Sequence, residues 1–331
     1  MQRRSLTVAL TTATIAAALA AGLPRAATAQ TAWPSQPVKI VVPTGPGSSL
    51  DLIVRLMSDK LAARWGQPVV VDNKPGAGGL LGVDIAAKAT DGHTLAIGFN
   101  GPLAYAPYLY AKVPYDPARD LKAIVMTSSQ ANVLAVNAEK VPAKTVAEFV
   151  AWGKAQAGKM NYSSLGQGSS AHLTMELFLS EAGLQAVHVP FNGSPPAAMA
   201  VAQGTADATF MVAPALLPHQ QSGKVRLLAV SATTKPEGLK DLPSLAEAGY
   251  PKVESLAWNG LVGPATLSDA VVARINADVN DLLAHDAPLR DAMAKSGLTI
   301  VGGSAAEFRR FIDADVARWG PVITRLGVKL N

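Results

Sequence analysis

Short apolar runs alternate with amphipathic stretches from residue 38 onward. The run at 38–43 (VKIVVP) is rich in β-branched residues, which favour strands, and apolar side chains then recur at helical spacing over 52–65. Two further strand-like runs, at 68–73 and 93–98, flank an apolar helical pattern at 80–89. Strand and helix signals that alternate at this pitch predict parallel βαβ units, and therefore an α/β fold.

The same alternation continues towards the end of the chain. Thr145 and Glu148 form a capping-box pattern, which predicts a helix that begins there and runs to Ala155. The remaining patterns predict strands at 122–128, 132–137, 160–164, 186–191, 206–212, 225–231 and 255–263, and helices at 173–182, 196–202, 268–284, 288–296 and 304–318. So many units favour two lobes over one very large sheet.

The first 29 residues have the pattern of an export signal. Arg3 and Arg4 precede an uncharged run over 6–23, and Ala27-Thr28-Ala29 fits the A-x-A rule for cleavage before Gln30. We therefore expect an exported mature chain, by the general secretory route or by the twin-arginine route that the Arg pair partly resembles. No later segment holds 18 apolar residues without a charge, so no further membrane span is predicted.

Composition removes several classes of function. The whole chain carries 29 Lys and Arg against 24 Asp and Glu, and three of the Arg lie in the expected signal. The mature chain is therefore close to neutral, and no nucleic-acid partner is expected. The absence of cysteine excludes disulfides, thiolate metal sites and a cysteine nucleophile. The five histidines show no metal-ligand spacing, so neither a metal nor a cofactor is expected.

Two segments share one design: a short strand, a loop of small residues, then an amphipathic helix. They are VVPTGPGSSLD at 41–51 and NYSSLGQGSSAH at 161–172. A helix begins with four unpaired backbone N–H groups and a partial positive charge, and small residues let an anion approach them. Each loop is therefore a candidate seat for a carboxylate or phosphate, although Ser, Gly and Asp before a helix also fit ordinary capping.

These loops do not match the known nucleotide-binding or serine-hydrolase motifs. The stretch 166–171 (GQGSSA) matches the spacing of a dinucleotide site, but the strand-like run at 186–191 ends in Pro and Phe instead of the required acid. No phosphate-loop motif and no G-x-S-x-G or S-x-x-K serine motif occurs. Ser169 and His172 are close in sequence, which does not identify a catalytic triad. No catalytic residue is therefore predicted.

The mature chain resembles the Bug family, the substrate-binding proteins of tripartite tricarboxylate transporters. The resemblance runs nearly end to end and rests on WPSQPVKIVVPTGPGSSLD, LAARWGQPVVVDNKPGAGGLLG, ATDGHTLAIG, VPYDPARDL, GKMNYSSLGQGSSAHLTMELF, VHVPFNGSPPA, GKVRLLAVS and LPSLAEAGYP. It implies no enzymatic activity and a Venus-flytrap fold of two α/β lobes, with two crossing connections and the ligand in the cleft. We place lobe 1 at 30–125 and 232–331 and lobe 2 at 126–231.

By position, the resemblance implies a ligand carboxylate held between the two loops. The implied residues are Thr44, Pro46, Gly47, Ser48, Ser49 and Asn100 in lobe 1 and Ser164, Gly166, Gly168, Ser169, Ser170 and Met211 in lobe 2. The chain departs from the family pattern at Thr44, where an aromatic is common, and at 48–50, which replace a Gly-Gly-rich turn. Met211 stands where many members carry an Asp facing the distal end of the ligand, and Met cannot pair with a cation.

We therefore expect a periplasmic solute-binding protein, acting as a monomer, that captures a small organic carboxylate and delivers it to membrane transporter subunits. Neutral donors on both walls, with a thioether between them, favour a dicarboxylate or an aromatic carboxylate over an amino acid or a sugar. The alternative is a ligand sensor of the same fold that acts on a signalling partner. An exported α/β hydrolase is a more distant third.

Overall fold

The computed structural model describes residues 33–330 except 234 and 236, so the expected export signal at 1–29 lies outside the described residues. The chain divides into Met1–Ser35 and Gln36–Asn331, and the helices and strands described below belong to the second unit. No helix in the described part is long and apolar enough to cross a membrane.

Ten strands in the described residues form one connected sheet, and the chain has the predicted α/β composition. Their bounds are β1 Val38–Val42, β2 Val69–Asn73, β3 Thr94–Phe99, β4 Leu121–Asn137, β5 Asn161–Ser164, β6 Val187–Pro190, β7 Ala208–Val212, β8 Val225–Val230, β9 Leu256–Pro264 and β10 Thr299–Gly302. The order is β2-β1-β3-β9-β4-β7-β5-β6, with β8 and β10 also paired to β4.

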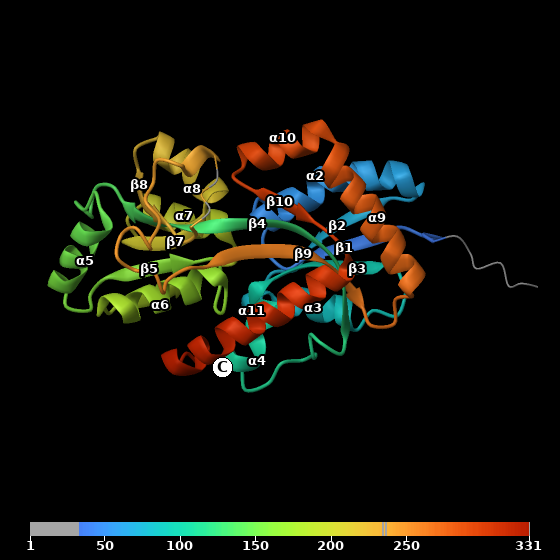
Figure 1. Cartoon of the computed structure of the whole chain (residues 1–331), viewed down its shortest axis with the longest axis horizontal. Coiled ribbons are helices and arrows are strands. Elements are labelled where there is room, and N and C mark those ends of the chain that lie inside the picture. Colours follow the sequence, from blue (N-terminus) through green and yellow to red (C-terminus); the bar gives the residue numbers. More distant parts are fainter. Residues whose placement is uncertain (1–32, 234, 236, 331) are drawn as a thin grey trace, which may run out of the picture. The chain divides into compact units, whose positions relative to one another are not determined.

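The strands fall into two groups that share β4. β1 pairs in parallel with β2 and β3, and β5 pairs in parallel with β6 and β7. β4 pairs with β9 over its first part, from Leu121 to Ala131, and with β7 and β8 from Asn132 onward. We call β1–β3, β9, β10 and their helices lobe 1, and β5–β8 and their helices lobe 2; β4 and β9 run between them (Figure 1). Because β4 continues without a break, the exact lobe boundaries stay a prediction.

Helices cover both faces of the sheet in each lobe. Their bounds are α2 Ser49–Trp65, α3 Leu80–Ala87, α4 Ala106–Leu109, α5 Val146–Ala155, α6 Ser170–Ala182, α7 Ser194–Ala202, α8 Ala213–Gln221, α9 Asp269–His285, α10 Ala287–Lys295 and α11 Ala305–Leu326, with short helical turns η1 Ala77–Gly79, η2 Gly101–Tyr105 and η3 Glu237–Leu239. In lobe 1, α2 and α9 pack on one face and α3 and α11 on the other; in lobe 2, α7 and α8 oppose α6 (Figure 1).

Among the apolar clusters between sheet and helices, two bear on the site. The larger cluster extends from lobe 1 residues such as Val83 and Phe308 to lobe 2 residues such as Phe178 and Phe210, which are all almost fully buried. The smaller cluster packs α7 and α8 against β4, β7 and β8. Because the larger core continues under β4, the two lobes share buried apolar surface, which stabilises the arrangement of the loops that follow β1 and β5.

The sequence predictions were wrong at β4 and missed several short elements, among them η2, α4 and η3. The two strands predicted at 122–128 and 132–137 are one strand, β4, whose register against β9 shifts twice, so that the strand bends without ending. Helix α8 was not predicted, because Pro214 and Pro218 resemble helix breakers; Pro214 lies in the first turn, where its missing N–H costs nothing. The short edge strand β10 was also missed.

Candidate ligand-binding site

The first loop, residues 43–48, connects β1 to α2. Ser48 caps α2: its backbone is extended and its hydroxyl accepts the Asp51 N–H at 3.3 Å. The Thr44 and Ser48 hydroxyl oxygens are 2.6 Å apart, and the Ser49 hydroxyl accepts from the Gln130 side-chain amide at 3.3 Å. Thr44, Ser48 and Ser49 are buried, whereas Pro46 and Gly47 are exposed.

A buried carboxylate holds this first loop in shape. Asp51 accepts the Gly47 N–H at 2.9 Å, the Arg55 Nε at 3.0 Å and the Asn73 side-chain amide at 2.9 Å. The same Asn73 amide reaches the Thr44 carbonyl oxygen at 3.1 Å, so both ends of the loop are tied to one group. Burial raises the pKa of Asp51, but the hydrogen bonds from Arg55, Gly47 and Asn73 outweigh it, and the pKa falls below its usual value. Asp51 is therefore ionised at neutral pH.

The second loop, residues 165–169, connects β5 to α6 in the same way. Ser169 caps α6: its hydroxyl accepts the His172 N–H at 3.3 Å and donates to the Gly166 carbonyl at 2.7 Å. The Ser164 hydroxyl accepts the Gly166 N–H at 3.2 Å. Gly166 and Gly168 have φ of 144° and 72°, a region that side chains with a Cβ rarely adopt, so the turn requires glycine at both positions. Ser170 is buried in the first turn of α6.

Two neutral histidines lie under the second loop. The Gly168 N–H donates to His172 Nδ1 at 3.1 Å, and His188 Nε2 lies 2.7 Å from the Ser164 hydroxyl. The two imidazoles stack with ring centroids 4.0 Å apart and planes within 11°, and Tyr162 stacks on His188 at 4.9 Å. Burial, with a smaller contribution from His188, lowers the pKa of His172 to about 3, and burial lowers the pKa of His188 to about 4. Both rings are therefore uncharged at neutral pH.

The two loops meet around a small cavity of about 20 Å³, which is room for about one water molecule. Thr44 from the first loop and Gly166 from the second both line it. The other lining residues are Pro43, Pro75, Gly76, Gly78, Gly79, Phe99, Leu165, Phe191 and Asn192. No lining residue is Lys or Arg, so the polar groups that face this cavity in the described structure are uncharged.

Backbone atoms of the two lobes approach each other closely beside this cavity. The Gly45 N–H donates to the Asn192 carbonyl across the cleft at 3.2 Å. A Cβ on Gly45 would lie 2.9 Å from that carbonyl oxygen, and a Cβ on Gly78 would overlap the Gln167 carbonyl oxygen. A Cβ on Gly101 would lie 3.0 Å from the Gly168 carbonyl oxygen. Glycine at these positions therefore permits the lobes to come together as they do here.

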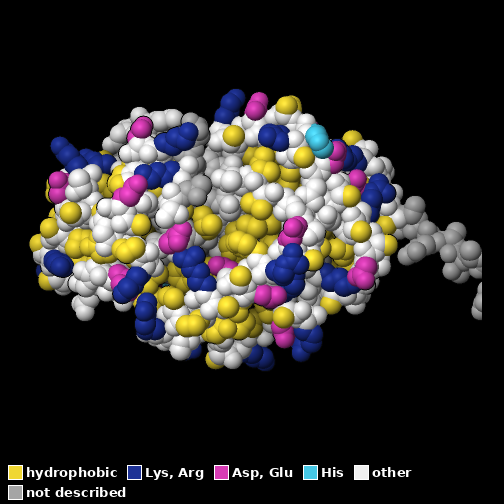
Figure 2. Space-filling model, viewed as in Figure 1, with side chains coloured by type: hydrophobic (Ala, Val, Ile, Leu, Met, Phe, Trp, Pro, Cys, Tyr) yellow, Lys and Arg dark blue, Asp and Glu magenta, His cyan; other side chains and the backbone are white. Residues whose placement is uncertain are grey.

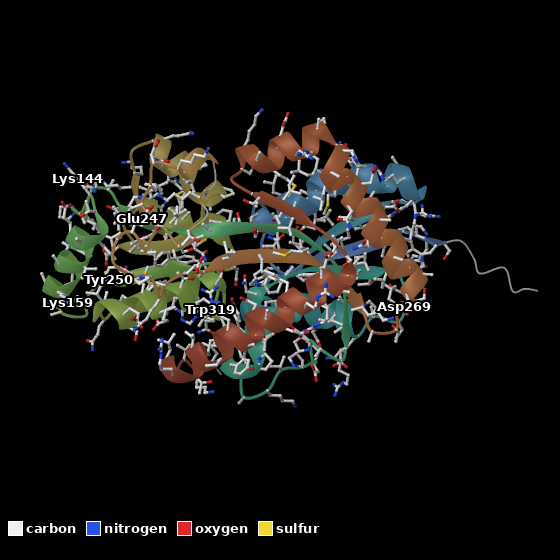
Figure 3. All side chains as sticks on the ribbon, viewed as in Figure 1. Lys144, Lys159, Glu247, Tyr250, Asp269 and Trp319 are labelled. Atoms are coloured by element: carbon white, nitrogen blue, oxygen red, sulfur yellow. The ribbon has the colours of Figure 1, made fainter. Side chains whose placement is uncertain are left out.

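Of the twelve predicted site residues, Thr44 and Gly166 line the cavity. Eight others belong to the same two loops or to the strand and helix ends that flank them, but do not line it: Pro46, Gly47, Ser48, Ser49, Ser164, Gly168, Ser169 and Ser170. Asn100 does not line it: its side-chain amide donates to the Tyr105 hydroxyl at 3.0 Å and the Leu256 carbonyl at 3.1 Å, and its oxygen accepts the Trp258 N–H. Tyr105 packs on Trp319 of α11, so this group joins the end of β3 to β9 and α11. Trp319 is labelled on that helix in Figure 3. Met211 is fully buried on β7, in the cluster against which the lining residues Leu165 and Phe191 pack.

The wall formed by residues 75–79 was missed in the sequence. The segment PGAGG was interpreted only as the start of a helix, although three glycines before a helix are the same kind of signal as the other two loops. The structure has Gly76, Gly78 and Gly79 at positive φ, and all three line the cavity. Phe191 and Asn192 gave no sequence signal of their own.

A larger cavity of about 220 Å³ lies between α8 and the turn from α10 to β10. It is lined by Ala213, Leu217, Gly238, Leu239, Ala294, Lys295, Gly297, Leu298 and Thr299. Among its described lining residues the charged side chain is that of Lys295, which is exposed, and none of the predicted site residues lines it. A cavity of about 300 Å³ beside α9 and β10 is larger still, and it too contains no predicted site residue. The smallest of the three lies where two helix-preceding loops converge, which is where α/β proteins bind ligands.

A family model for the tripartite tricarboxylate transporter family receptor, TctC, matches residues 53–328. The chain belongs to this family. Among solved structures, R. palustris Rpa4515 with adipate has a TM-score of 0.86 and 31% identity, covering 90% of this chain and 100% of that one. MatC from Rhodopseudomonas palustris with bound malate has a TM-score of 0.83 and 27% identity, covering 88% and 100%. The periplasmic binding protein BugD has a TM-score of 0.84 and 25% identity, covering 90% and 100%.

These likenesses confirm the predicted resemblance and the fold. The chain has the two-lobed α/β fold of the periplasmic binding proteins, and its family is one of substrate-binding proteins, not of enzymes. Two of the similar structures carry a dicarboxylate, adipate or malate.

Proposed function

We propose that this protein binds a small organic carboxylate between its two lobes, in the periplasm, and delivers it to a tripartite tricarboxylate-type membrane transporter. The observation that carries the proposal is one cavity lined by both loops, by Pro43 and Thr44 of the first and by Leu165 and Gly166 of the second, where each loop leads to a serine-capped helix start. The structures with adipate and malate support the ligand class, because both ligands carry a carboxylate at each end.

The donors for such an anion are uncharged. The backbone N–H groups of Ser49 and Leu50 in α2, and of Ser170 and Ala171 in α6, precede the first N–H that bonds within each helix. Helix dipoles place partial positive charge at the same ends. Because no Lys or Arg lines the cavity, we expect affinity that depends only weakly on salt concentration.

The apolar part of the wall favours a hydrocarbon spacer over an ammonium group. Phe99, Leu165 and Phe191 line the cavity, and the thioether of Met211 lies in the core behind two of them. No acidic side chain lines the cavity to pair with an amino group. We therefore propose a dicarboxylate or an aromatic carboxylate in preference to an amino acid. Because the cavity has room for about one water molecule in this structure, such a ligand requires the two lobes to separate to admit it. Asn100 and Met211 contribute to binding by supporting the residues that form the cavity walls.

The surface agrees with a small-molecule role. Lys and Arg side chains are interspersed with Asp and Glu over the face in Figure 2, without a basic area of the size that nucleic acid requires. Export through residues 1–29 and action as a monomer belong to the same proposal. A ligand sensor of the same fold is the alternative. Uptake of labelled ligand by cells that lack this gene distinguishes the two functions. Where the transporter is already expressed, loss of a sensor leaves uptake intact, whereas loss of the transport protein abolishes it.

A calorimetric and thermal-shift screen tests the ligand class. Adipate, glutarate, malate and benzoate are compared with glutamate, and a ligand at about a hundred times its dissociation constant adds about 2.7 kcal/mol of stability. Thr44→Val keeps the shape of a lining residue but removes its hydroxyl, and we expect it to weaken binding about tenfold. Ser222→Ala, on exposed chain after α8, is the matched control. Stabilisation by no carboxylate, or a preference for glutamate over glutarate, refutes the proposal.

A further inference from the structure

The peptide between Gln167 and Gly168 has one side in lobe 2 and the other against lobe 1. Its N–H, on Gly168, donates to His172 Nδ1 at 3.1 Å inside lobe 2. Its carbonyl, on Gln167, lies against Gly78 of lobe 1, so closely that a Cβ on Gly78 would overlap it. The N–H and C=O of a trans peptide point in opposite directions. His172 Nδ1, by accepting the Gly168 N–H, therefore keeps the Gln167 carbonyl pointing towards lobe 1.

The acceptor on His172 is set by its surroundings. Since Nδ1 accepts a hydrogen bond, the proton of the neutral ring is on Nε2, which faces the Glu176 carboxylate at 4.0 Å. Glu176 in turn accepts a short hydrogen bond from the Tyr162 hydroxyl. The His188 ring lies flat on His172 and contacts the Ser164 hydroxyl, the residue that also holds the Gly166 N–H.

We propose that His172, supported by His188, is a positioning residue for ligand capture: it holds the Gln167–Gly168 peptide in the orientation that lets lobe 1 close on the ligand. This inference rests on the proposed function, and it adds residues that lie outside the cavity. Neither histidine lines the cavity, so each acts through the loop and not by touching ligand. A flipped or mobile peptide would present an N–H, or no fixed group, to Gly78.

Two substitutions at His172 separate the acceptor from the aromatic ring. His172→Asn places an amide oxygen near the position of Nδ1 and removes the stacking ring. His172→Phe keeps a ring of similar size against His188 and removes the acceptor. A role in positioning the peptide makes the Phe variant the worse binder, whereas a role in core packing alone makes the Asn variant the worse one. His219→Phe, on α8 and away from the loop, is the control.

The test has one readout with ligand and one without. Hydrogen exchange of the Gly168 amide in the ligand-free protein should be at least about tenfold faster in His172→Phe than in wild type, and within about threefold of wild type in His172→Asn. Adipate affinity, measured by calorimetry, should follow the same order. Unchanged Gly168 exchange in the Phe variant, or weaker adipate binding by the Asn variant than by the Phe variant, overturns the inference. Failure of wild type to bind any carboxylate instead refutes the proposed function, and leaves the exchange result to decide this inference.

Discussion

The two loops of the candidate site are built alike and held in different ways. Each follows a parallel strand and ends in a serine that caps a helix, Ser48 before α2 and Ser169 before α6. The first loop is held from below by an ionised carboxylate, Asp51, whereas the second is held by two uncharged imidazoles, His172 and His188. The same loop geometry can therefore be supported by a charged or by a neutral group.

The difference follows from what surrounds each support. Asp51 is 3% exposed, no more than His172, but the half-exposed Arg55 pairs with it, so burial does not neutralise it. His172 is 4% exposed and stacks on a second imidazole, and a charge on either ring would face the other without water. The neutral support also avoids a fixed charge under a loop that we propose binds an anion.

The largest expected difference between the two supports is in their response to pH. The pKa of His172 lies at about 3 and that of His188 at about 4, below the ordinary histidine pKa of about 6.5. Between pH 6.5 and pH 4 the unfolded chain therefore binds more protons than the folded chain. The contribution of the two neutral histidines to the unfolding free energy is thus fully present above pH 6.5 and decreases as the pH falls. The titratable groups that face the pair are Tyr162 and Glu176.

We expect a loss of about 3 kcal/mol in unfolding free energy from pH 7 to pH 5, measured by urea denaturation. In the same range Asp51 stays ionised, because its pKa is lowered from 3.8, and its contribution is lost only as the pH falls below about 4. A double variant, His172→Asn with His188→Asn, should remove most of the slope between pH 7 and pH 5 whatever its absolute stability. An equal slope in that variant contradicts the comparison.

Removing the charged support should cost somewhat less. Asp51→Ala leaves the Gly47 N–H and the Asn73 amide without their acceptor and separates Arg55 from its partner. Breaking a buried ion pair costs about 3–5 kcal/mol, but the Arg55 side chain is 53% exposed and regains water, so we expect a loss of about 2 kcal/mol. Urea denaturation at pH 7 measures it.

Asp51→Asn should recover part of this loss, because one side-chain oxygen can still accept the Gly47 N–H. Asp269→Asn, at an exposed first-turn position of α9, is the matched control and should cost under about 0.5 kcal/mol. If Asp51→Ala were no worse than the Asp269 variant, the first loop would not depend on its carboxylate.

The repeating part of the fold could be predicted from the sequence. β-branched runs such as 38–43 and apolar helical spacing such as 52–65 are local signals, and the structure has β1 and α2 there. The serine caps at Ser48 and Ser169 are equally local, because a cap bonds to an N–H within three residues. The continuity of β4 could not be predicted, since it depends on register shifts against a partner far away in the sequence.

The supports of the site depended on non-local contacts and were missed. His172 and His188 gave no signal as isolated histidines, and they meet only because His188 is paired in register with Tyr162 when β5 and β6 form a parallel pair. Asp51 has the sequence signal of any acidic residue in the first turn of a helix, and its bond to Asn73 requires β2 to lie beside β1. Residue type and spacing therefore indicated which loops matter, but not what holds them.

The next prediction separates the closing of the lobes from the support of the loops. Gly45 has an ordinary φ, so alanine is tolerated by the backbone, but its Cβ would lie 2.9 Å from the Asn192 carbonyl oxygen of lobe 2. We expect Gly45→Ala to weaken adipate binding about tenfold, or about 1.4 kcal/mol, with little change in the unfolding free energy of the ligand-free protein. Gly238→Ala, where nothing lies within 4 Å of the new Cβ, is the control.

The outcome that contradicts this is a Gly45→Ala protein that binds as wild type, which would mean that the lobes do not need this approach to hold ligand. A fall in unfolding free energy that matches the fall in binding would instead show that the substitution damages the first loop itself. Calorimetry and urea denaturation on the same preparation distinguish the two.

The smallest effect concerns the serine caps, the feature that the two loops share. Replacing a capping serine with alanine costs about 1 kcal/mol, because one N–H in the first turn loses its acceptor. Ser268→Ala, at an exposed cap of α9 with a 3.3 Å bond and no ligand loop before it, should cost this amount. Ser48→Ala and Ser169→Ala should each cost about 0.5 kcal/mol more, because each hydroxyl makes a second hydrogen bond, that of Ser48 with Thr44 at 2.6 Å and that of Ser169 to the Gly166 carbonyl at 2.7 Å. Urea denaturation measures these losses, and equal losses for Ser169→Ala and Ser268→Ala would mean that the second loop is held by its histidines alone. Hydrogen exchange gives a second measurement. Faster exchange of the Gly168 amide in Ser169→Ala, but not in Ser48→Ala, would show that the cap and the histidines act on the same turn.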